Sequence, residues 1–155
     1  MGSGGGVPGL VLAVRWPDCA VVLVDASERR TDFLRHAVER LRLVRVSVVR
    51  ARAEAVGRDP FQRGRADLVV ARGFGPPAVT AECAAPLLRV GGRLIVSDPP
   101  GDAEARWPDS GVAALGLGGR RQVRMPAAFT VLEQLAPCPA RFPRRVGVPA
   151  KRPLF

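Results

Sequence analysis

The chain has 155 residues, of which 47% are apolar and 25% are charged, and this predicts one domain with a hydrophobic core. Its longest apolar runs, residues 10–14 and 20–24, are far shorter than the ~20 residues of a membrane span, and no signal peptide is expected. Three widely spaced cysteines without a C-x-x-C pair argue against a disulfide framework or a zinc site. We therefore expect a cytoplasmic protein that needs no membrane and no metal.

The charge balance favours a polyanionic partner. The chain has 24 Lys and Arg against 14 Asp and Glu, and Lys151 is the only lysine. A preference for arginine also follows from genomic base composition, but a net charge of +10 favours nucleic acid in either case. No acidic residue follows Glu133, whereas five basic residues do: Arg141, Arg144, Arg145, Lys151 and Arg152.

Strands and helices are expected to alternate along the chain. The apolar run of residues 20–25 ends in Asp25 and predicts a buried parallel strand. Ser27 can cap a helix over residues 28–43, whose predicted apolar face includes Phe33 and Leu34. The other predicted elements are strands at 44–48, 67–71 and 93–96, a helix at 78–89, a break at Gly91 and Gly92, and a hairpin of 122–125 with 129–135.

This alternation indicates an α/β fold with a mostly parallel sheet that helices cover on both faces. We expect residues 1–135 to form one Rossmann-like domain. Residues 136–155 contain five prolines and are predicted to form an extended basic tail that packs on the same domain.

The glycine-rich opening predicts a ligand site. Glycines that precede a helix, here expected to start at Pro8, let backbone amides approach an electron-rich ligand. Asp25 ends the next strand about 20 residues after Gly4, where an acid of a doubly wound sheet accepts hydrogen bonds from ribose hydroxyls.

The opening also allows three other interpretations. Gly4, Gly6 and Gly9 satisfy G-x-G-x-x-G, which allows a nicotinamide or flavin site, and a glycine-rich start is also typical of an expression scar or a flexible terminus. A loop of this kind normally follows a strand. We therefore expect a chain that begins late and lacks the first strand of its sheet.

Five motifs in order resemble the RsmG (GidB) family, the bacterial 16S rRNA guanine-N7 methyltransferases. They are GSGGGVPGLVLA at residues 2–13, VDAS at 24–27, RAE at 52–54, AR at 71–72, and the proline- and arginine-rich end at 142–154. The resemblance implies a class I S-adenosylmethionine-dependent methyltransferase fold without its first strand and N-terminal helices. It also implies S-adenosyl-L-methionine as cofactor, the 16S rRNA of the small ribosomal subunit as substrate, and a monomer.

The resemblance implies roles for individual residues. Arg72 would orient the cofactor or the target base and is the predicted catalytic residue. The acid-free tail, rather than the resemblance, predicts the RNA contacts, which are the five basic residues after Glu133, with Arg45 and Arg50 as further candidates. The predicted cofactor contacts are Gly2, Val7, Ala53, Glu54 and Arg72 from the resemblance, joined by Gly4 and Asp25 from the loop-and-acid pattern.

One departure from the family leaves an alternative open. Residues 97–100 read Ser-Asp-Pro-Pro where the family has Lys-Gly, so Asp98 replaces a cation. A catalytically impaired RNA- or ribosome-binding paralogue is therefore the second hypothesis. The oxidoreductase hypothesis is weaker, because the chain has no Tyr, one Lys near its end and one His, His36, inside a predicted helix. Guanine N7 methylation needs no such partner, and we expect His36 to be a surface or packing residue.

Overall fold

The computed structural model describes residues 1–99 and 106–155. Contacts within the chain group these residues into two compact units, Met1–Ala53 and Glu54–Phe155. The tail of residues 136–155 belongs to the second unit. The predicted domain boundary at residue 135 remains a prediction. No helix of the described residues is long and apolar enough to cross a bilayer.

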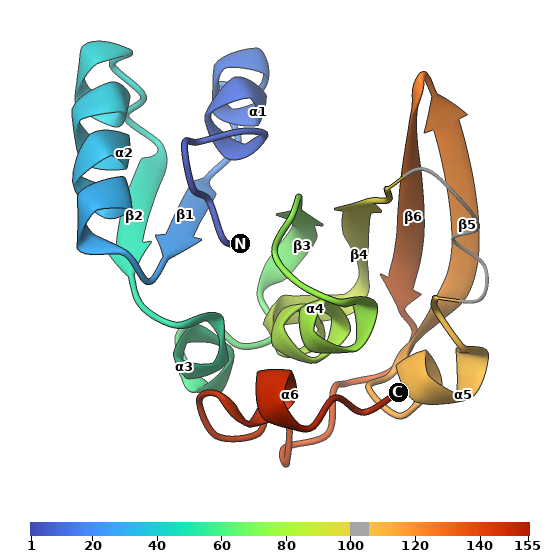
Figure 1. Ribbon diagram of the computed structural model, residues 1–155. Helices are drawn as coiled ribbons and strands as arrows, with labels where there is room; N and C mark the ends of the chain where they lie inside the picture. The colour runs from blue at the N-terminus through green and yellow to red at the C-terminus, as the bar shows by residue number, and fades with distance from the viewer. Residues whose placement is uncertain (100–105) are drawn as a thin grey trace. The chain divides into compact units, whose positions relative to one another are not determined.

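Unit 1 is built on a parallel pair of strands, and its elements are α1 (Gly9–Arg15), β1 (Val21–Asp25), α2 (Glu28–Arg40) and β2 (Val46–Arg50). The two strands pair in register from Val21 opposite Val46 to Asp25 opposite Arg50. The connecting helix α2 contacts both strands and α1 contacts β1, as Figure 1 shows. This β-α-β unit is the one predicted from the buried run at 20–25 and the helical pattern after it.

Helix α2 differs from its prediction in its length and in its buried face. It ends at Arg40 because Arg42 adopts a left-handed conformation, with φ of 52°, which an α-helix cannot continue through. Thr31 and Leu34 are its fully buried residues, whereas Phe33 is 54% exposed and the prediction that it faces the core is wrong. Phe33 is one residue from Leu34, about 100° around the helix, and therefore leaves the face that Leu34 buries.

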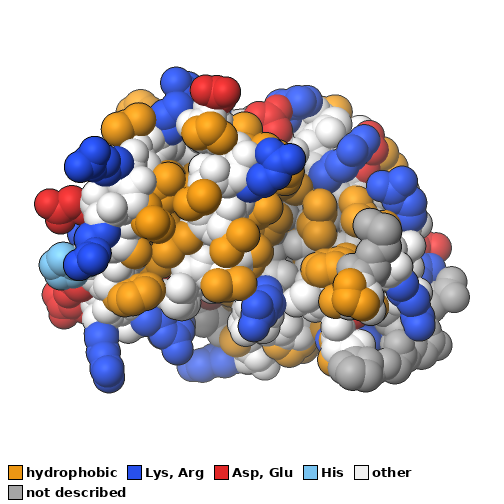
Figure 2. Space-filling view, turned by 90° about the horizontal axis from the view of Figure 1, so that it is seen from above, with side chains coloured by type: hydrophobic (Ala, Val, Ile, Leu, Met, Phe, Trp, Pro, Cys, Tyr) orange, Lys and Arg blue, Asp and Glu red, His pale blue; other side chains and the backbone are white. Residues whose placement is uncertain are grey.

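Apolar side chains are exposed over α1 and α2 of unit 1. Figure 2 shows orange side chains gathered there between arginines. The exposed set comprises Val7, Val11, Val14, Trp16, Phe33, Leu41 and Val44. His36, the chain's one histidine, is exposed on α2, as predicted.

Unit 2 holds a four-stranded mixed sheet in the order β3-β4-β6-β5. Its strands β3 and β4 are parallel, and β6 runs antiparallel to both β4 and β5, so the predicted hairpin at the chain's end is confirmed. The elements are α3 (Ala53–Arg58), β3 (Ala66–Ala71), α4 (Pro77–Ala84), η1 (Ala85–Leu87), β4 (Leu88–Ser97), α5 (Asp109–Ala113), β5 (Leu117–Met125), β6 (Ala127–Gln134) and α6 (Val148–Lys151). Helix α3 begins at the last residue of unit 1.

Gly91 and Gly92 lie inside β4, not between a helix and a strand as predicted. Leu88 already pairs with Ala66, and the register then shifts before Arg93 pairs with Leu68. A Cβ on Gly92 would lie 2.8 Å from the carbonyl oxygen of Ala66, so only glycine fits this close approach of two strands. The glycine pair therefore forms an irregularity within a longer strand.

The core of unit 2 is centred on α4, where every residue from Ala78 to Ala84 is buried. Cys83 is among them, and burial raises the pKa of its thiol from 9.0 to about 12. Burial also raises the pKa of Cys138 to about 11, against the opposing effect of the nearby Arg63 cation. Cys19 is exposed.

The different exposure of the three cysteines predicts that thiol reagents label them selectively. At pH 8 a maleimide or a disulfide reagent is expected to label Cys19 rapidly and the other two cysteines only after unfolding, because the thiolate is the reactive form. The thiols of Cys83 and Cys138 have a higher pKa in the folded chain than in the unfolded chain. Above pH 9 the unfolded chain therefore loses these thiol protons first, and the free energy of unfolding falls as pH rises. Mass spectrometry of the labelled peptides measures how far each cysteine has reacted. Equal labelling of Cys83 and Cys19 in the folded protein would contradict it.

The tail of residues 136–155 packs on unit 2 but is not extended throughout, because α6 forms within it. Arg63 anchors it through carbonyl oxygens. Its Nη1 donates to Phe142 O at 2.6 Å, and its Nη2 donates to Cys138 O at 2.8 Å and Pro139 O at 3.0 Å. A guanidinium has five N–H donors in a fixed geometry, so it can bind several carbonyl oxygens of a segment that has no regular secondary structure.

Candidate functional site

The glycine-rich loop and Asp25 are joined directly in unit 1. The backbone N–H of Gly4 donates to Asp25 Oδ2 at 2.8 Å, and the N–H of Ser3 donates to the carbonyl oxygen of Val24 at 2.9 Å. The loop therefore lies at the carboxyl end of β1, beside the acid that ends it. The spacing of about 20 residues between loop and acid indicated this proximity, and the structure brings the two together.

The loop needs glycine at several positions. Gly2, Gly4 and Gly6 have φ of 62°, 51° and 90°, in the left-handed region that other residues rarely adopt. A Cβ at Gly6 would overlap the side chain of Leu10 in α1, whereas a Cβ at Gly5 would meet no atom within 4 Å. The loop therefore packs tightly where it enters α1 and exposes bare backbone before it. Helix α1 starts at Gly9, one residue later than predicted, with Pro8 at its N-cap.

Asp25 is nearly buried, with 6% of its surface exposed, and its two oxygens are both engaged. Oδ1 accepts the N–H of Ser27 at 2.9 Å, and the guanidinium of Arg30 lies 3.8 Å from Oδ2. Ser27 is the N-cap of α2 as predicted, but its side chain makes no capping hydrogen bond, so its backbone amide is the group in use. A carboxylate has about four lone-pair sites, which leaves this one able to accept further donors such as ribose hydroxyls.

This end of β1 fits an adenosyl group. It offers open glycine backbone, a carboxylate with spare acceptor sites, and an exposed Val7 beside the loop. Ala53, also predicted to contact the cofactor, is buried at the start of α3.

Two further predicted cofactor residues belong to unit 2. Glu54 is 8% exposed, and its Oε1 accepts the backbone N–H of Gly147 at 3.0 Å. The side chain of Glu54 therefore binds the tail. The group predicted to contact adenine is the backbone N–H of Glu54. Arg72 is exposed and follows the last residue of β3. The cofactor contacts of Glu54 and Arg72 remain predictions.

The tail arginines divide into one inward-facing residue and others that are exposed. Glu82 on α4 is fully buried and receives hydrogen bonds from Arg144 N–H at 2.8 Å, Nε at 2.8 Å and Nη2 at 2.6 Å. Hydrogen bonding to Glu82 raises the pKa of Arg144. The exposed cations of the tail are Arg141, Arg145, Lys151 and Arg152. Sequence reasoning missed this ion pair, although a lone acid within the apolar stretch 77–88 was its signal.

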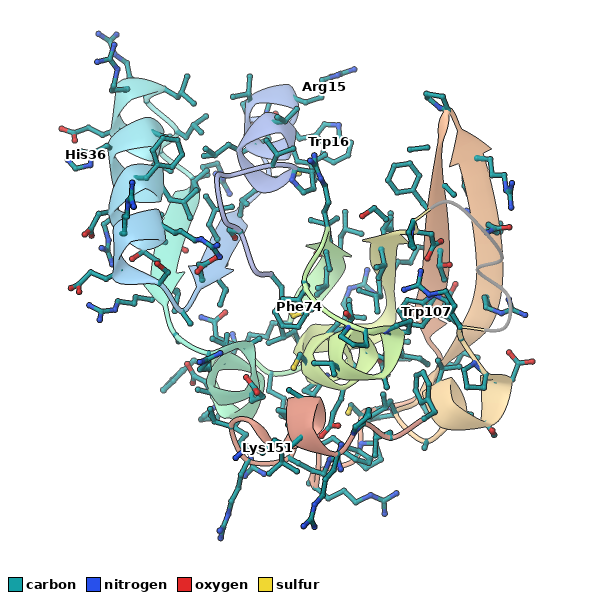
Figure 3. The ribbon with its side chains drawn as sticks, in the orientation of Figure 1. Arg15, Trp16, His36, Phe74, Trp107 and Lys151 are labelled. Atoms are coloured by element: carbon teal, nitrogen blue, oxygen red, sulfur yellow. The ribbon has the colours of Figure 1, made fainter. Side chains whose placement is uncertain are left out.

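A pocket of about 340 Å³ lies in unit 2, at the carboxyl ends of β3 and β4. Phe74 and Trp107, both labelled in Figure 3, contribute aromatic side chains to its wall. The other lining residues are Gly73, Gly75, Pro77, Val96, Ser97, Asp98, Pro99 and Arg106. This is the position, outside the carboxyl ends of parallel strands, where α/β proteins bind ligands.

Asp98 is the charged centre of this pocket's wall, with only 1% of its side chain exposed. Its Oδ2 accepts the hydroxyl of Thr130 at 2.8 Å, while Arg106 lies 3.9 Å from Oδ1. The cation expected from the family is therefore replaced by an acid that has a cation nearby, which the sequence did not reveal. Pro100, the last residue of the Ser-Asp-Pro-Pro segment, lies outside the described residues.

No group of three or more His, Cys, Asp or Glu side chains suited to a metal occurs among residues 1–99 and 106–155.

Comparisons with known proteins agree on one family. The family model of GidB, rRNA small subunit methyltransferase G, matches residues 1–97. The chain is 41% identical to ribosomal RNA small subunit methyltransferase G of Rubrobacter xylanophilus over 165 residues, covering 99% of this chain and 63% of the relative. It is 37% identical to the protein of that name from Chloroflexus aggregans, covering 99% of this chain and 68% of the relative. The chain thus spans about two-thirds of the length of these relatives.

Among solved structures, the chain is similar to the apo form of the S-adenosylmethionine-dependent methyltransferase SibL. The TM-score is 0.68 at 17% sequence identity, covering 87% of this chain and 49% of that one. At this identity the similarity establishes the fold, and the relatives establish the family. The chain belongs to the rRNA small subunit methyltransferase G family and has the Rossmann-like fold of class I S-adenosylmethionine-dependent methyltransferases.

Proposed function

We propose that the chain transfers the methyl group of S-adenosyl-L-methionine to N7 of a guanine in 16S rRNA. The observation that carries this proposal is the hydrogen bond from the Gly4 amide to Asp25, which joins the glycine loop to the acid. The family and its named relatives supply the substrate class. We further propose that the protein acts on the small ribosomal subunit as a cytoplasmic monomer without a metal.

In this proposal the chain's own groups hold and orient the cofactor. S-Adenosylmethionine supplies a methyl group on a positively charged sulfur. The backbone of Gly2 and Gly4 would lie along its methionine end, and Asp25 would accept hydrogen bonds from its ribose. Val7, Ala53 and the amide of Glu54 are proposed to contact the adenosyl group, and Arg72 to bind a carboxylate or phosphate through its fork of donors.

Methyl transfer to guanine N7 depends on the positioning of the base and the methyl donor more than on proton transfer. Guanine N7 carries a free lone pair at neutral pH, so no base has to remove a proton before it attacks the methyl group. The exposed position of His36 accords with a mechanism that uses no histidine. The catalytic contribution of the protein would then come from holding the base and the methyl donor in line.

The tail is proposed to bind rRNA phosphate. Arg141, Arg145, Lys151 and Arg152 are exposed, and the part of the tail that carries them is anchored to unit 2. Cations of this kind give affinity that weakens with salt, because each phosphate contact releases counterions. Arg144, predicted together with them, is proposed to hold the tail in position through Glu82 rather than to meet RNA.

The test is nucleoside mass analysis after incubation of small ribosomal subunits with the full chain and S-adenosylmethionine. The expected result is new N7-methylguanosine in 16S rRNA, with none when the cofactor is omitted. A non-catalytic rRNA-binding protein is the second candidate, because Asp98 stands where the resemblance implies a cation. Salt-sensitive binding of the subunit without any methylated nucleoside would favour that candidate and overturn the proposed activity.

A further inference from the structure

The pocket in unit 2 has two charged groups with unused hydrogen-bonding capacity side by side. Among the described residues, Asp98 Oδ1 accepts one long hydrogen bond, from the indole Nε1–H of Trp107 at 3.5 Å, and an oxygen with two lone pairs can accept a second. Arg106 Nη1 is buried and has no hydrogen-bond partner among the described residues, although it lies 3.9 Å from the same oxygen. Buried polar groups are normally paired, and leaving them unpaired costs free energy. An acceptor and a donor are therefore available together at one wall.

The carboxylate of Asp98 is held at a fixed position. The Thr130 hydroxyl binds Asp98 Oδ2, and the backbone N–H of Asp98 donates to Ala128 O at 2.9 Å. Trp107 is 1% exposed, and its indole Nε1–H donates to Asp98 Oδ1 at 3.5 Å. A ligand would therefore meet a preorganised carboxylate rather than a mobile surface side chain, and preorganisation lowers the cost of binding.

We infer that this pocket binds the target guanine, with Asp98 as the residue that distinguishes guanine from adenine. The inference rests on the proposed function and adds the residue that selects the base. Along its Watson–Crick edge guanine presents O6 as an acceptor, followed by the N1–H and N2–H donors. O6 complements the unpartnered Nη1 of Arg106, and the two donors complement the carboxylate of Asp98.

Adenine mismatches both groups. It places an amino donor where guanine has O6, facing Arg106, and a lone pair where guanine has N1–H, facing Asp98. Phe74 lines the same pocket and supplies an aromatic surface of the kind on which unstacked bases rest. Recognition through O6 and N1 leaves N7 uncovered, as methylation at that atom requires.

The test uses nucleotide titrations of the ¹⁵N-labelled full chain, read from its two indole resonances. Trp107 belongs to the pocket and Trp16, in unit 1, is the internal control. Guanosine monophosphate is expected to shift the Trp107 resonance, with adenosine monophosphate binding about tenfold or more weakly. Inosine monophosphate lacks the N2 amino group and should fall between the two.

Two variants assign the preference to its residues. Asp98→Asn should lose the preference for guanine at least tenfold, whereas Asp67→Asn, the same change at an exposed acid of unit 2 paired with Arg89, should keep it. Arg106→Gln alters a side chain that is 35% exposed, and it should also reduce the preference even where the Asp98 variant fails to fold.

Each outcome decides the inference separately from the proposed activity. An unshifted Trp107 resonance, equal affinity for the guanine and adenine nucleotides, or unchanged selectivity in Arg106→Gln overturns the pocket assignment. Formation of N7-methylguanosine on ribosomal subunits together with any of these results would leave the proposed function standing without this pocket. Selective guanine binding without methylation would support the pocket assignment and overturn the proposed function.

Discussion

Replacing Arg144 by methionine is expected to lower the free energy of unfolding by about 3–5 kcal/mol, because it leaves Glu82 as an uncompensated buried charge. Glu82 is fully buried, and of its hydrogen bonds from Arg144 only the one from the backbone N–H would survive the change. Urea unfolding followed by circular dichroism measures the effect. The double variant Glu82→Gln/Arg144→Met should recover part of the loss, since neither charge then remains.

Arg145→Met is the matched control for this prediction. It removes the neighbouring cation, which is exposed, and should leave stability within about 0.5 kcal/mol of the wild-type value. Its expected effect is on RNA, where loss of one phosphate contact reduces the slope of binding against salt by about one. An Arg144 variant with unchanged stability and a reduced salt slope would show that Arg144 contacts phosphate and that the Glu82 pair is unimportant.

Replacing Asp25 by asparagine is expected to weaken S-adenosylhomocysteine binding by roughly 10- to 150-fold, the equivalent of one or more hydrogen bonds to a charged group. The carboxylate accepts the amides of Gly4 and Ser27, so an asparagine amide would set a donor against one of these donors. The substitution therefore disturbs the glycine loop as well as any ribose contact. Isothermal titration calorimetry measures the affinity.

Asp32→Asn is the control for this variant. Asp32 lies in the same unit on α2, is exposed and pairs with Arg35 at 2.7 Å, so its loss should leave the affinity unchanged. Thermal unfolding of both variants separates a local effect from a loss of fold. Equal affinity of Asp25→Asn and the wild-type protein would remove Asp25 from the cofactor site.

The parts of the fold that follow local patterns were predictable from the sequence. The apolar run at 20–25, the helical period after it and the alternation in the last hairpin each became the expected element. The joining of the glycine loop to Asp25 was predictable as well, because one helix and one strand, α1 and β1, bring the chain back from the loop to the sheet edge where the loop lies.

Two of the contacts that sequence reasoning missed join residues far apart in the chain. Arg144 was expected at phosphate because it lies among other cations, whereas its partner Glu82 is 62 residues away. Asp98 was interpreted only as a reversed charge, because the sequence does not show its contact with Thr130. That contact forms only when β6 pairs with β4. Gly91 and Gly92 were interpreted as a break because a bulge within a strand has the same glycine signature as a turn.

Titration of the ¹⁵N-labelled full chain with S-adenosylhomocysteine, followed at the backbone amides of Gly4 and Ser27, tests the cofactor site most directly. Both amides donate to the Asp25 carboxylate, so a ribose that binds this carboxylate should shift both resonances along one saturable curve. If both resonances stay in place at millimolar ligand, the adenosyl group does not bind at the glycine loop and the account of this site is wrong.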